Sequence, residues 1–283
     1  MQSLRLPVIS VEDVVRGSID GMQDKSVRAA VEKVIAEFSL ANEKFVKSIK
    51  EGTLHALQSS HFEISGFSNA EIVKIVYEDG MICRKGGRRY YDLLKSLPRY
   101  GECPLCGIGD VETLDHYLPK SRFPALCVSP ANLIPACRDC NTEKREVLPR
   151  VPGDVTLHPY FDRVDHDQWL HARVVQECPP RLEFVVIPPI GWAPVLKERA
   201  GSHLRVFKLG KRYASHANRT MSSIRLILES QYECGQGVGV AEYLDGEART
   251  RLLEKPNSYL GVTYQALAAN PWFCDEGFKL FKI

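Results

Sequence analysis

Two closely spaced pairs of cysteines form the strongest chemical pattern in the sequence. Cys-x-x-Cys occurs twice, with 30 residues between the two pairs. Each pair turns the backbone so that two sulfurs face one point, and together the pairs supply the four soft thiolates that tetrahedral Zn²⁺ prefers. Because four protein ligands leave no open position, such a site is structural, and it stabilises a segment that has few apolar residues of its own. The predicted zinc ligands are Cys103, Cys106, Cys137 and Cys140. The alternatives are two unrelated pairs or a redox Cys-x-x-Cys.

A group of polar residues lies between and just after the two cysteine pairs. Its members are Asp115, His116, Asn132, Asn141 and Lys144. Imidazole titrates near neutral pH and can take a proton from water, whereas carboxylate and amide oxygens are suitable ligands for Mg²⁺ or Mn²⁺. Cleavage of a phosphodiester needs such a base, together with a cation that neutralises charge on the phosphate and on the departing oxygen. The pattern therefore favours phosphodiester hydrolysis.

Taken together, these motifs resemble the HNH endonucleases that carry a four-cysteine zinc site. The resemblance covers residues 100–150 and rests on the two cysteine pairs, the Asp-His pair, the central Asn and the ending Cys-Asn-x-x-Lys, with Asn141 where the family often has His. It implies the ββα-metal fold and a single catalytic Mg²⁺ or Mn²⁺ held by Asp115 and Asn141. His116 would be the general base, and Asn132 would hold the long loop or orient the His116 ring. The implied products carry a 5′-phosphate and a 3′-hydroxyl.

Basic residues gather around this segment, although the chain of 283 residues carries a net charge of only +2. Between Arg84 and Arg150 there are 12 Lys/Arg and 8 Asp/Glu. A nucleic acid, most plausibly DNA, would be attracted to this region and not to the whole surface. The candidate substrate contacts are Lys144, Lys120 and Arg122. For the cluster Arg84-Lys85-Gly-Gly-Arg88-Arg89, an ordinary solvated surface is the alternative.

Each polar residue also has a plain structural interpretation. Asn132 could be a turn residue, Asn141 a helix N-cap and Lys144 a solvated helix residue. An Asp-His pair is usually a surface or turn feature, but here it follows a predicted strand inside the zinc-bound segment. Among the other histidines, His158 follows the segment closely enough to contact it or the substrate.

The elements expected around these residues indicate an α+β fold. Apolar residues at helical spacing and a capping box at Ser68-Asn-Ala-Glu71 predict a helical N-terminal part. Two short strands separated by a long loop, followed by a helix, are expected in residues 100–150, which we call the motif segment. The expected helices cover 24–57 (one helix or two abutting ones), 70–77, 88–95, 141–148 and 194–232; the expected strands cover 111–116, 133–136, 172–176 and 182–187. Beyond Glu233 we expect a glycine-rich linkage and short helices.

Three regions are predicted along the chain. They are a helical N-terminal lobe (1–98), a central ββα-metal module with zinc knuckles (99–150), and a mixed strand and helix region that binds substrate or a partner (151–283). No 18-residue apolar run and no leader-like N-terminus is found, so we expect a cytoplasmic protein without a membrane span. Nine cysteines, five of them scattered singly, fit a reducing compartment better than a disulfide framework.

The expected function is therefore that of a metal-dependent HNH endonuclease acting on DNA. Chains that resemble this one look like the nuclease subunits of bacterial defence systems that work beside an ATPase, so an ATPase partner and a role against phage are further expectations. Two other functions stay open. One is a non-catalytic zinc module that binds nucleic acid, and the other is an adaptor subunit whose nuclease is silent until assembly.

Overall fold

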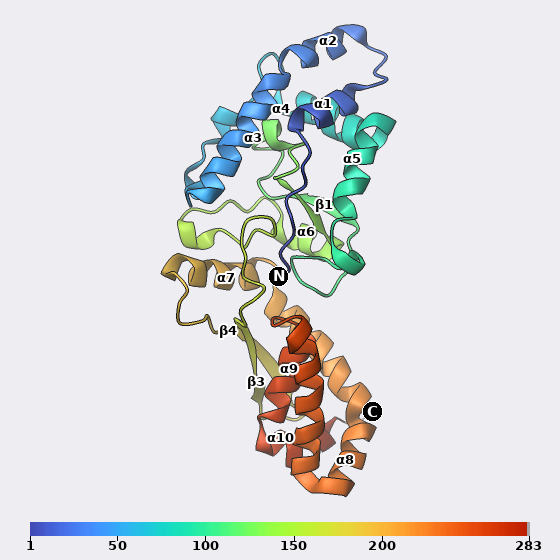
Figure 1. Cartoon of the computed structure of the whole chain (residues 1–283), viewed down its shortest axis with the longest axis vertical. Helices are drawn as coiled ribbons and strands as arrows, with labels where there is room; N and C mark the ends of the chain where they lie inside the picture. Colours follow the sequence, from blue (N-terminus) through green and yellow to red (C-terminus); the bar gives the residue numbers. More distant parts are fainter. Residues whose placement is uncertain (282–283) are drawn as a thin grey trace. The chain divides into compact units, whose positions relative to one another are not determined.

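The computed structural model describes residues 1–281 and shows a mixed α+β protein, mostly helical, with two small antiparallel sheets. The chain divides into two compact units, Gln2–Asp162 and the part from Arg163 onward together with Met1. The predicted helical lobe and the predicted zinc module both lie within the first unit (Figure 1). Among the described residues, no helix combines the length and the apolar composition that a membrane span requires.

Helices make up most of the first unit. The predicted helix over 24–57 consists of two abutting helices, because Val34 leaves helical geometry between them. The predicted capping box is present, with the Ser68 hydroxyl accepting from the Glu71 backbone and the Glu71 side chain accepting from the Ser68 backbone. The helix that it opens continues directly into a π-helix, η3. The bounds are α1 Val11–Ile19, α2 Lys25–Lys33, α3 Ile35–Lys50, α4 Asn69–Val73, η3 Lys74–Cys83 and α5 Lys85–Lys95. Single 3-10 turns cover Leu54–Ala56, Ser59–Phe62, Arg99–Gly101, Pro124–Leu126, Pro152–Asp154 and, in the second unit, Gly277–Leu280.

Glycines bring α1, η3 and α5 into backbone contact. A Cβ on Gly86 would lie 2.5 Å from the carbonyl oxygen of Gly17, and one on Gly87 would lie 2.7 Å from the carbonyl oxygen of Gly80. Only residues without a side chain permit so close an approach. The three helices therefore form one rigid group, and α5 in turn contacts both strands of the first sheet.

The first sheet is a two-stranded hairpin of β1 (Thr113–His116) and β2 (Leu133–Ala136), in which Asp115 pairs with Ile134. Both predicted strands are confirmed, although β1 begins two residues later than expected. The helix predicted over 141–148 was wrong in position, since α6 covers Arg138–Lys144. Cys137 caps its start, and Arg145 ends it with a positive φ of 49°.

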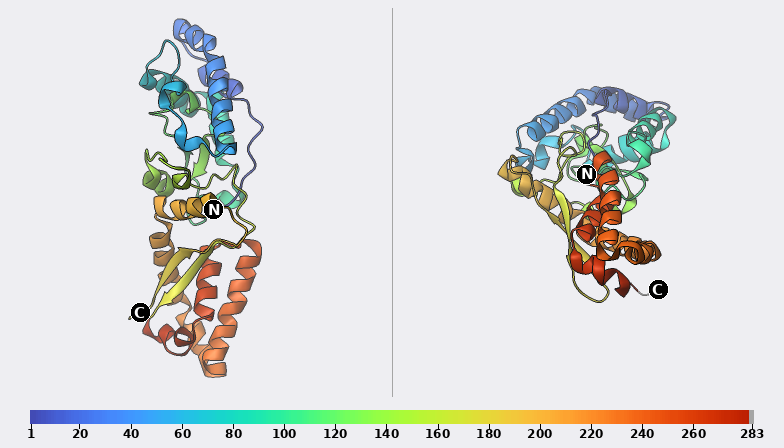
Figure 2. Two further views of the ribbon diagram at one scale, coloured as in Figure 1. Left: turned by 90° about the vertical axis from the view of Figure 1, so that its left-hand side faces the viewer. Right: turned by 60° about the horizontal axis from the view of Figure 1, so that its bottom comes forward.

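The second unit has its own hairpin, β3 (Leu170–Val175) and β4 (Arg181–Val186), which packs against α9 and α8 (Figure 2). Both strands and the helical stretch after them agree with prediction. The expectation of short helices beyond Glu233 was wrong for the first part of that segment, because α8 runs to Glu254 with a break at Gln236 among glycines. The helices are α7 Pro194–Val206, α8 Leu209–Glu254, α9 Tyr259–Ala268 and α10 Pro271–Asp275.

Candidate metal centre and active site

The four cysteines of the two pairs converge on one point in the first unit. Their sulfurs all lie within 4.8 Å of one another, and the four residues are buried. The sulfurs of Cys106 and Cys137 are 3.7 Å apart. A tetrahedron with metal–sulfur bonds of about 2.3 Å has sulfur–sulfur edges of about 3.8 Å, so the observed spacing fits Zn²⁺. The cluster could hold a zinc ion in the way that the sequence predicts.

Local backbone geometry presents these sulfurs. In the first knuckle the Gly107 N–H donates to the Cys103 carbonyl at 2.8 Å, and Gly107 has a φ of 65°, a conformation that favours glycine. In the second knuckle the Cys140 N–H points at the Cys137 sulfur at 3.5 Å, at the start of α6. One knuckle precedes β1 and the other joins β2 to α6. A bound zinc ion would therefore fix the hairpin to the helix.

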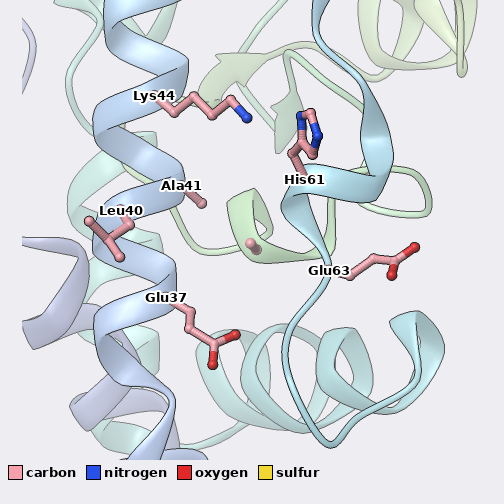
Figure 3. A pocket seen from close by; sticks show the side chains of 7 residues that line it. Glu37, Leu40, Ala41, Lys44, His61 and Glu63 are labelled. Atoms are coloured by element: carbon pink, nitrogen blue, oxygen red, sulfur yellow. The ribbon is translucent and has the colours of Figure 1, made fainter.

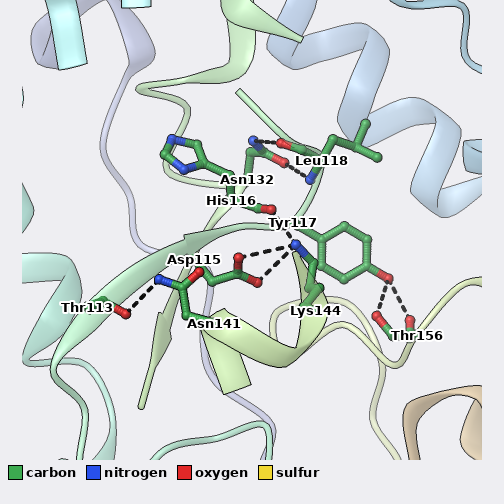
Figure 4. Close-up of polar contacts among 9 residues, drawn as sticks. All are labelled: Thr113, Asp115, His116, Tyr117, Leu118, Asn132, Asn141, Lys144 and Thr156. Carbon is green, nitrogen blue, oxygen red and sulfur yellow. Dashed lines mark hydrogen bonds and ion pairs between the residues drawn. The ribbon is translucent and has the colours of Figure 1, made fainter. Parts of the chain in front are cut away.

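Asp115 and Lys144 form a buried ion pair between β1 and α6. The Lys144 ammonium lies 3.2 Å and 3.0 Å from the two carboxylate oxygens, and it also donates to the His116 carbonyl at 2.5 Å. Each of the two side chains is about 4–6% exposed. Burial raises the pKa of Asp115, and the charge and hydrogen bond of Lys144 lower it. Both oxygens of the predicted metal ligand are thus engaged by an internal cation (Figure 4).

Asn141 lies one helical turn before Lys144, and its side chain meets the same face of β1. Its Nδ2 donates to the Thr113 hydroxyl at 3.1 Å. Thr113 and Asp115 are two residues apart in the strand and share a face, just as residues three apart share a face of the helix. Since Cys137 is the N-cap of α6, Asn141 is not. Its amide oxygen has no hydrogen bond among residues 1–281, which leaves that oxygen available as a ligand beside Asp115.

His116 follows Asp115 at the end of β1, and its ring extends to the other side of the strand (Figure 4). Its Nε2 lies 2.8 Å from the Cys127 carbonyl. A carbonyl only accepts, so Nε2 carries the proton and Nδ1 has the free lone pair. Within the described part of the chain Nδ1 makes no hydrogen bond, and the residue keeps 9% of its surface exposed. Burial lowers the pKa of His116 to about 3, and the Cys127 bond opposes that shift.

Asn132 is fully buried and bonds to the beginning and the middle of the loop that separates the two strands. Its Oδ1 accepts from the Leu118 N–H at 2.7 Å, and its Nδ2 donates to the carbonyls of Leu118 and Leu126 at 3.0 and 3.2 Å. The loop segment next to Leu126 includes Cys127, whose carbonyl bonds to His116. Asn132 therefore acts on the imidazole indirectly, through the backbone.

The helical part of the first unit contributes contacts to the site that no sequence motif predicts. Tyr77 of η3 packs edge-on against the His116 ring, with centroids 4.6 Å apart. Glu78 accepts from Lys120 at 2.5 Å, and the Lys120 ammonium lies 5.1 Å from the Tyr77 centroid. Burial raises the pKa of Tyr77, so it stays neutral. A π-helix often marks a functional region, but it has no distinctive sequence pattern to predict it from.

The remaining candidate residues lie around this centre. Lys120 is paired as described, Lys144 is buried, and Arg122 is exposed on the loop. His158 is buried, and its ring packs on Tyr117 with centroids 4.3 Å apart, so it contacts the residue that follows His116. His158 therefore packs against the motif segment inside the unit and does not face solvent.

An open hollow of about 230 Å³ lies on the helical part of the same unit (Figure 3). Its wall combines two carboxylates with a lysine and a histidine, and none of the candidate site residues contributes to it. The lining residues are Glu37, Leu40, Ala41, Lys44, His61, Glu63 and Ala125.

The sequence is similar to that of a phage protein. The chain is 29% identical over 236 residues to Protein ea31 of Escherichia phage lambda, an alignment that covers 79% of this chain and 79% of that protein. No family model matches the sequence. No solved structure matches it either. The similarity relates the chain to a phage protein whose name says nothing of an activity, so the chemistry has to be inferred from the residues themselves.

Proposed function

We propose that this chain is a zinc-stabilised endonuclease of the HNH type that hydrolyses phosphodiester bonds of DNA. The observation that carries the proposal is the state of His116, which is held by a backbone carbonyl through Nε2 and keeps a free lone pair on Nδ1. The order of hairpin, knuckle and helix and the convergence of Asp115 and Asn141 on one face of β1 support it. Asp115, His116 and Asn141 are assigned to catalysis, and Asn132 to positioning.

His116 is in the protonation state that a general base requires. Its Nδ1 would take a proton from a water molecule whose oxygen attacks phosphorus, while the bond from phosphorus to the 3′-oxygen breaks. A pKa of about 3 makes the free ring a weak base. The negative charge of a phosphate next to the ring raises that pKa, because an anion favours the imidazolium form. Substrate binding would therefore activate the base.

The residues present also suit a hard divalent ion, on one condition. The carboxylate of Asp115 and the amide oxygen of Asn141 are the donors that Mg²⁺ and Mn²⁺ prefer. When bound, such an ion neutralises charge on the phosphate and on the departing oxygen. Lys144 now occupies the carboxylate, so its ammonium has to move away before Asp115 can act as a metal ligand. The released ammonium would lie close to the bound phosphate, which is the contact predicted for Lys144 from the sequence.

A non-catalytic zinc module is the second candidate, and the Asp115–Lys144 ion pair favours it. A carboxylate that is permanently paired with lysine would keep the hairpin attached to α6 and bind no ion. The two candidate functions predict different behaviour with divalent ions: the endonuclease binds one at Asp115, and the non-catalytic module does not. Ion binding therefore distinguishes them. An ATPase partner, a cytoplasmic location and a role in defence against phage stay predictions of the family resemblance.

The proposal is tested by nicking of supercoiled plasmid DNA by the purified zinc-loaded chain in the presence of Mn²⁺. The substitution His116→Ala should reduce the rate by about 10²- to 10⁴-fold, as expected for loss of a general base, with zinc content unchanged. His166→Ala, at an exposed histidine of the second unit, is the matched control and should cleave like the unmodified chain. Cleavage that survives in His116→Ala contradicts the assigned base, and absence of cleavage in every variant favours the non-catalytic module.

A further inference from the structure

The lysines predicted to contact substrate are largely occupied within the protein. Lys144 is buried against Asp115, and Lys120 is paired with Glu78. Of the three predicted contacts, only Arg122 is exposed and outside the ion pairs described above. A nuclease has to hold several phosphates to position one of them, so the motif segment by itself offers too little positive surface.

Helix α5 supplies the positive surface that the motif segment lacks. From Arg84 to Tyr100 the sequence contains six Lys/Arg and a single acidic residue, Asp92. Arg84 turns inward, where it donates to two backbone carbonyls. The side chains at 85, 88 and 95 fall on one face of the helix at spacings of three and seven residues. Arg88 bonds to Asp92 at the surface, and Lys85 and Lys95 form no ion pair among residues 1–281.

This basic face is fixed next to the candidate active site. Helix α5 contacts both β1 and β2. Burial raises the pKa of Tyr91, and the Leu114 backbone, one residue before Asp115, lies close enough to the Tyr91 hydroxyl to lower it. The Arg88 guanidinium lies 5.2 Å and the Lys95 ammonium 5.8 Å from the Tyr91 ring centroid. Glycine contacts lock the start of the same helix to α1 and η3. Figure 1 shows α5 alongside β1. The cations therefore keep a constant position relative to β1.

We propose that the α5 face formed by Lys85, Arg88 and Lys95 around Tyr91 is a docking surface for the phosphate backbone of DNA. The charge sign selects a polyanion, and the cations extend over about 15 Å of helix, a length that spans on the order of four phosphates of one strand. The choice of DNA over another polyanion rests on the proposed function of the neighbouring site.

The test measures binding separately from cleavage. A fluorescein-labelled DNA duplex is titrated by fluorescence anisotropy into the full zinc-loaded chain carrying His116→Ala, with and without the double substitution Lys85→Gln and Lys95→Gln. The matched control is Lys47→Gln with Lys50→Gln, which removes the same charge from exposed positions of α3, a helix that packs against α1 and the Pro124–Leu126 turn. Thermal unfolding by circular dichroism checks that all variants fold.

Loss of the α5 lysines should raise Kd about ten-fold or more near physiological salt and should reduce the slope of log K against log salt by about 1.8, while the control stays within two-fold. An α5 variant that binds DNA like the control overturns the proposal. So does α5-dependent binding to phosphatidylserine vesicles without binding to DNA. The binding assay involves no hydrolysis, so its result is independent of cleavage. If the unmodified chain fails to cleave DNA while binding still depends on the α5 lysines, the proposed nuclease is rejected and the docking surface is kept.

Discussion

The two clusters of the motif segment differ in how ready they are for a metal ion. The four cysteine sulfurs already have the spacing of a zinc tetrahedron, and four thiolates so close together repel one another unless a metal ion neutralises them. The second cluster, called the oxygen cluster here, consists of the Asp115 carboxylate and the Asn141 amide oxygen. Its carboxylate is already paired with a cation, the ammonium of Lys144. The sulfur cluster therefore depends on its ion for structure. The oxygen cluster is already paired without one, and the proposed function requires that it exchange its lysine for an ion.

The largest effect is expected at the sulfur cluster. Cys103→Ser removes one ligand of a site whose binding energy contributes directly to folding, so the first unit should lose its zinc and its cooperative unfolding transition. Zinc content by mass spectrometry and near-ultraviolet circular dichroism measure this. Cys83→Ser changes an exposed cysteine of the same unit and should alter neither. A soluble, well-folded Cys103→Ser chain without zinc would show that the cluster is dispensable.

A second effect is expected when the lysine of the oxygen cluster is removed. Lys144→Met leaves the buried Asp115 carboxylate without a partner, which should lower the free energy of unfolding by about 3–5 kcal/mol when no divalent ion is present. With no competing ammonium, Mn²⁺ should then bind at least about ten-fold more tightly and restore much of this loss. Thermal unfolding with and without Mn²⁺ measures both changes. Lys120→Met, at an exposed ion pair, is the control. If Mn²⁺ stabilises Lys144→Met no more than the unmodified chain, Asp115 is not a metal ligand.

The smallest expected effect concerns His116 and pH. Its pKa is about 3 in the folded chain against about 6.5 in an unfolded one, so between these values the unfolded state binds the extra proton. The free energy of unfolding should therefore fall by about 1.4 kcal/mol for each pH unit below 6.5, a loss of about 2 kcal/mol by pH 5. In His116→Gln this contribution is absent. Denaturant unfolding of both chains at pH 6.5 and 5 isolates it, because changes at the zinc cluster cancel in the difference. Equal losses in the two chains would mean that the ring is hydrated and titrates normally.

Predictions from the sequence succeeded where a local pattern decides the structure. The capping box at Ser68 and the four strands depend on neighbouring residues and on alternation of side chains, and the structure confirms them. The helix predicted over 141–148 was wrong in position because Cys137 caps α6, so that the helix begins at Arg138, three residues before the predicted start. The helical run beyond Glu233 was missed because glycines there bend α8 at Gln236 without ending it.

What the sequence by itself determined is the composition of the two clusters: four soft thiolates in two pairs, and an imidazole next to a carboxylate and two amides. The type of metal ligand follows from the type of residue. Because the two cysteines of each Cys-x-x-Cys are only three residues apart, their sulfurs necessarily lie close together. Only the tertiary structure decided which cation lies at Asp115, which carbonyl orients His116, and that Tyr77 and α5 from the helical part adjoin the hairpin. These contacts join residues that lie far apart in the chain, and packing, not local propensity, selects them.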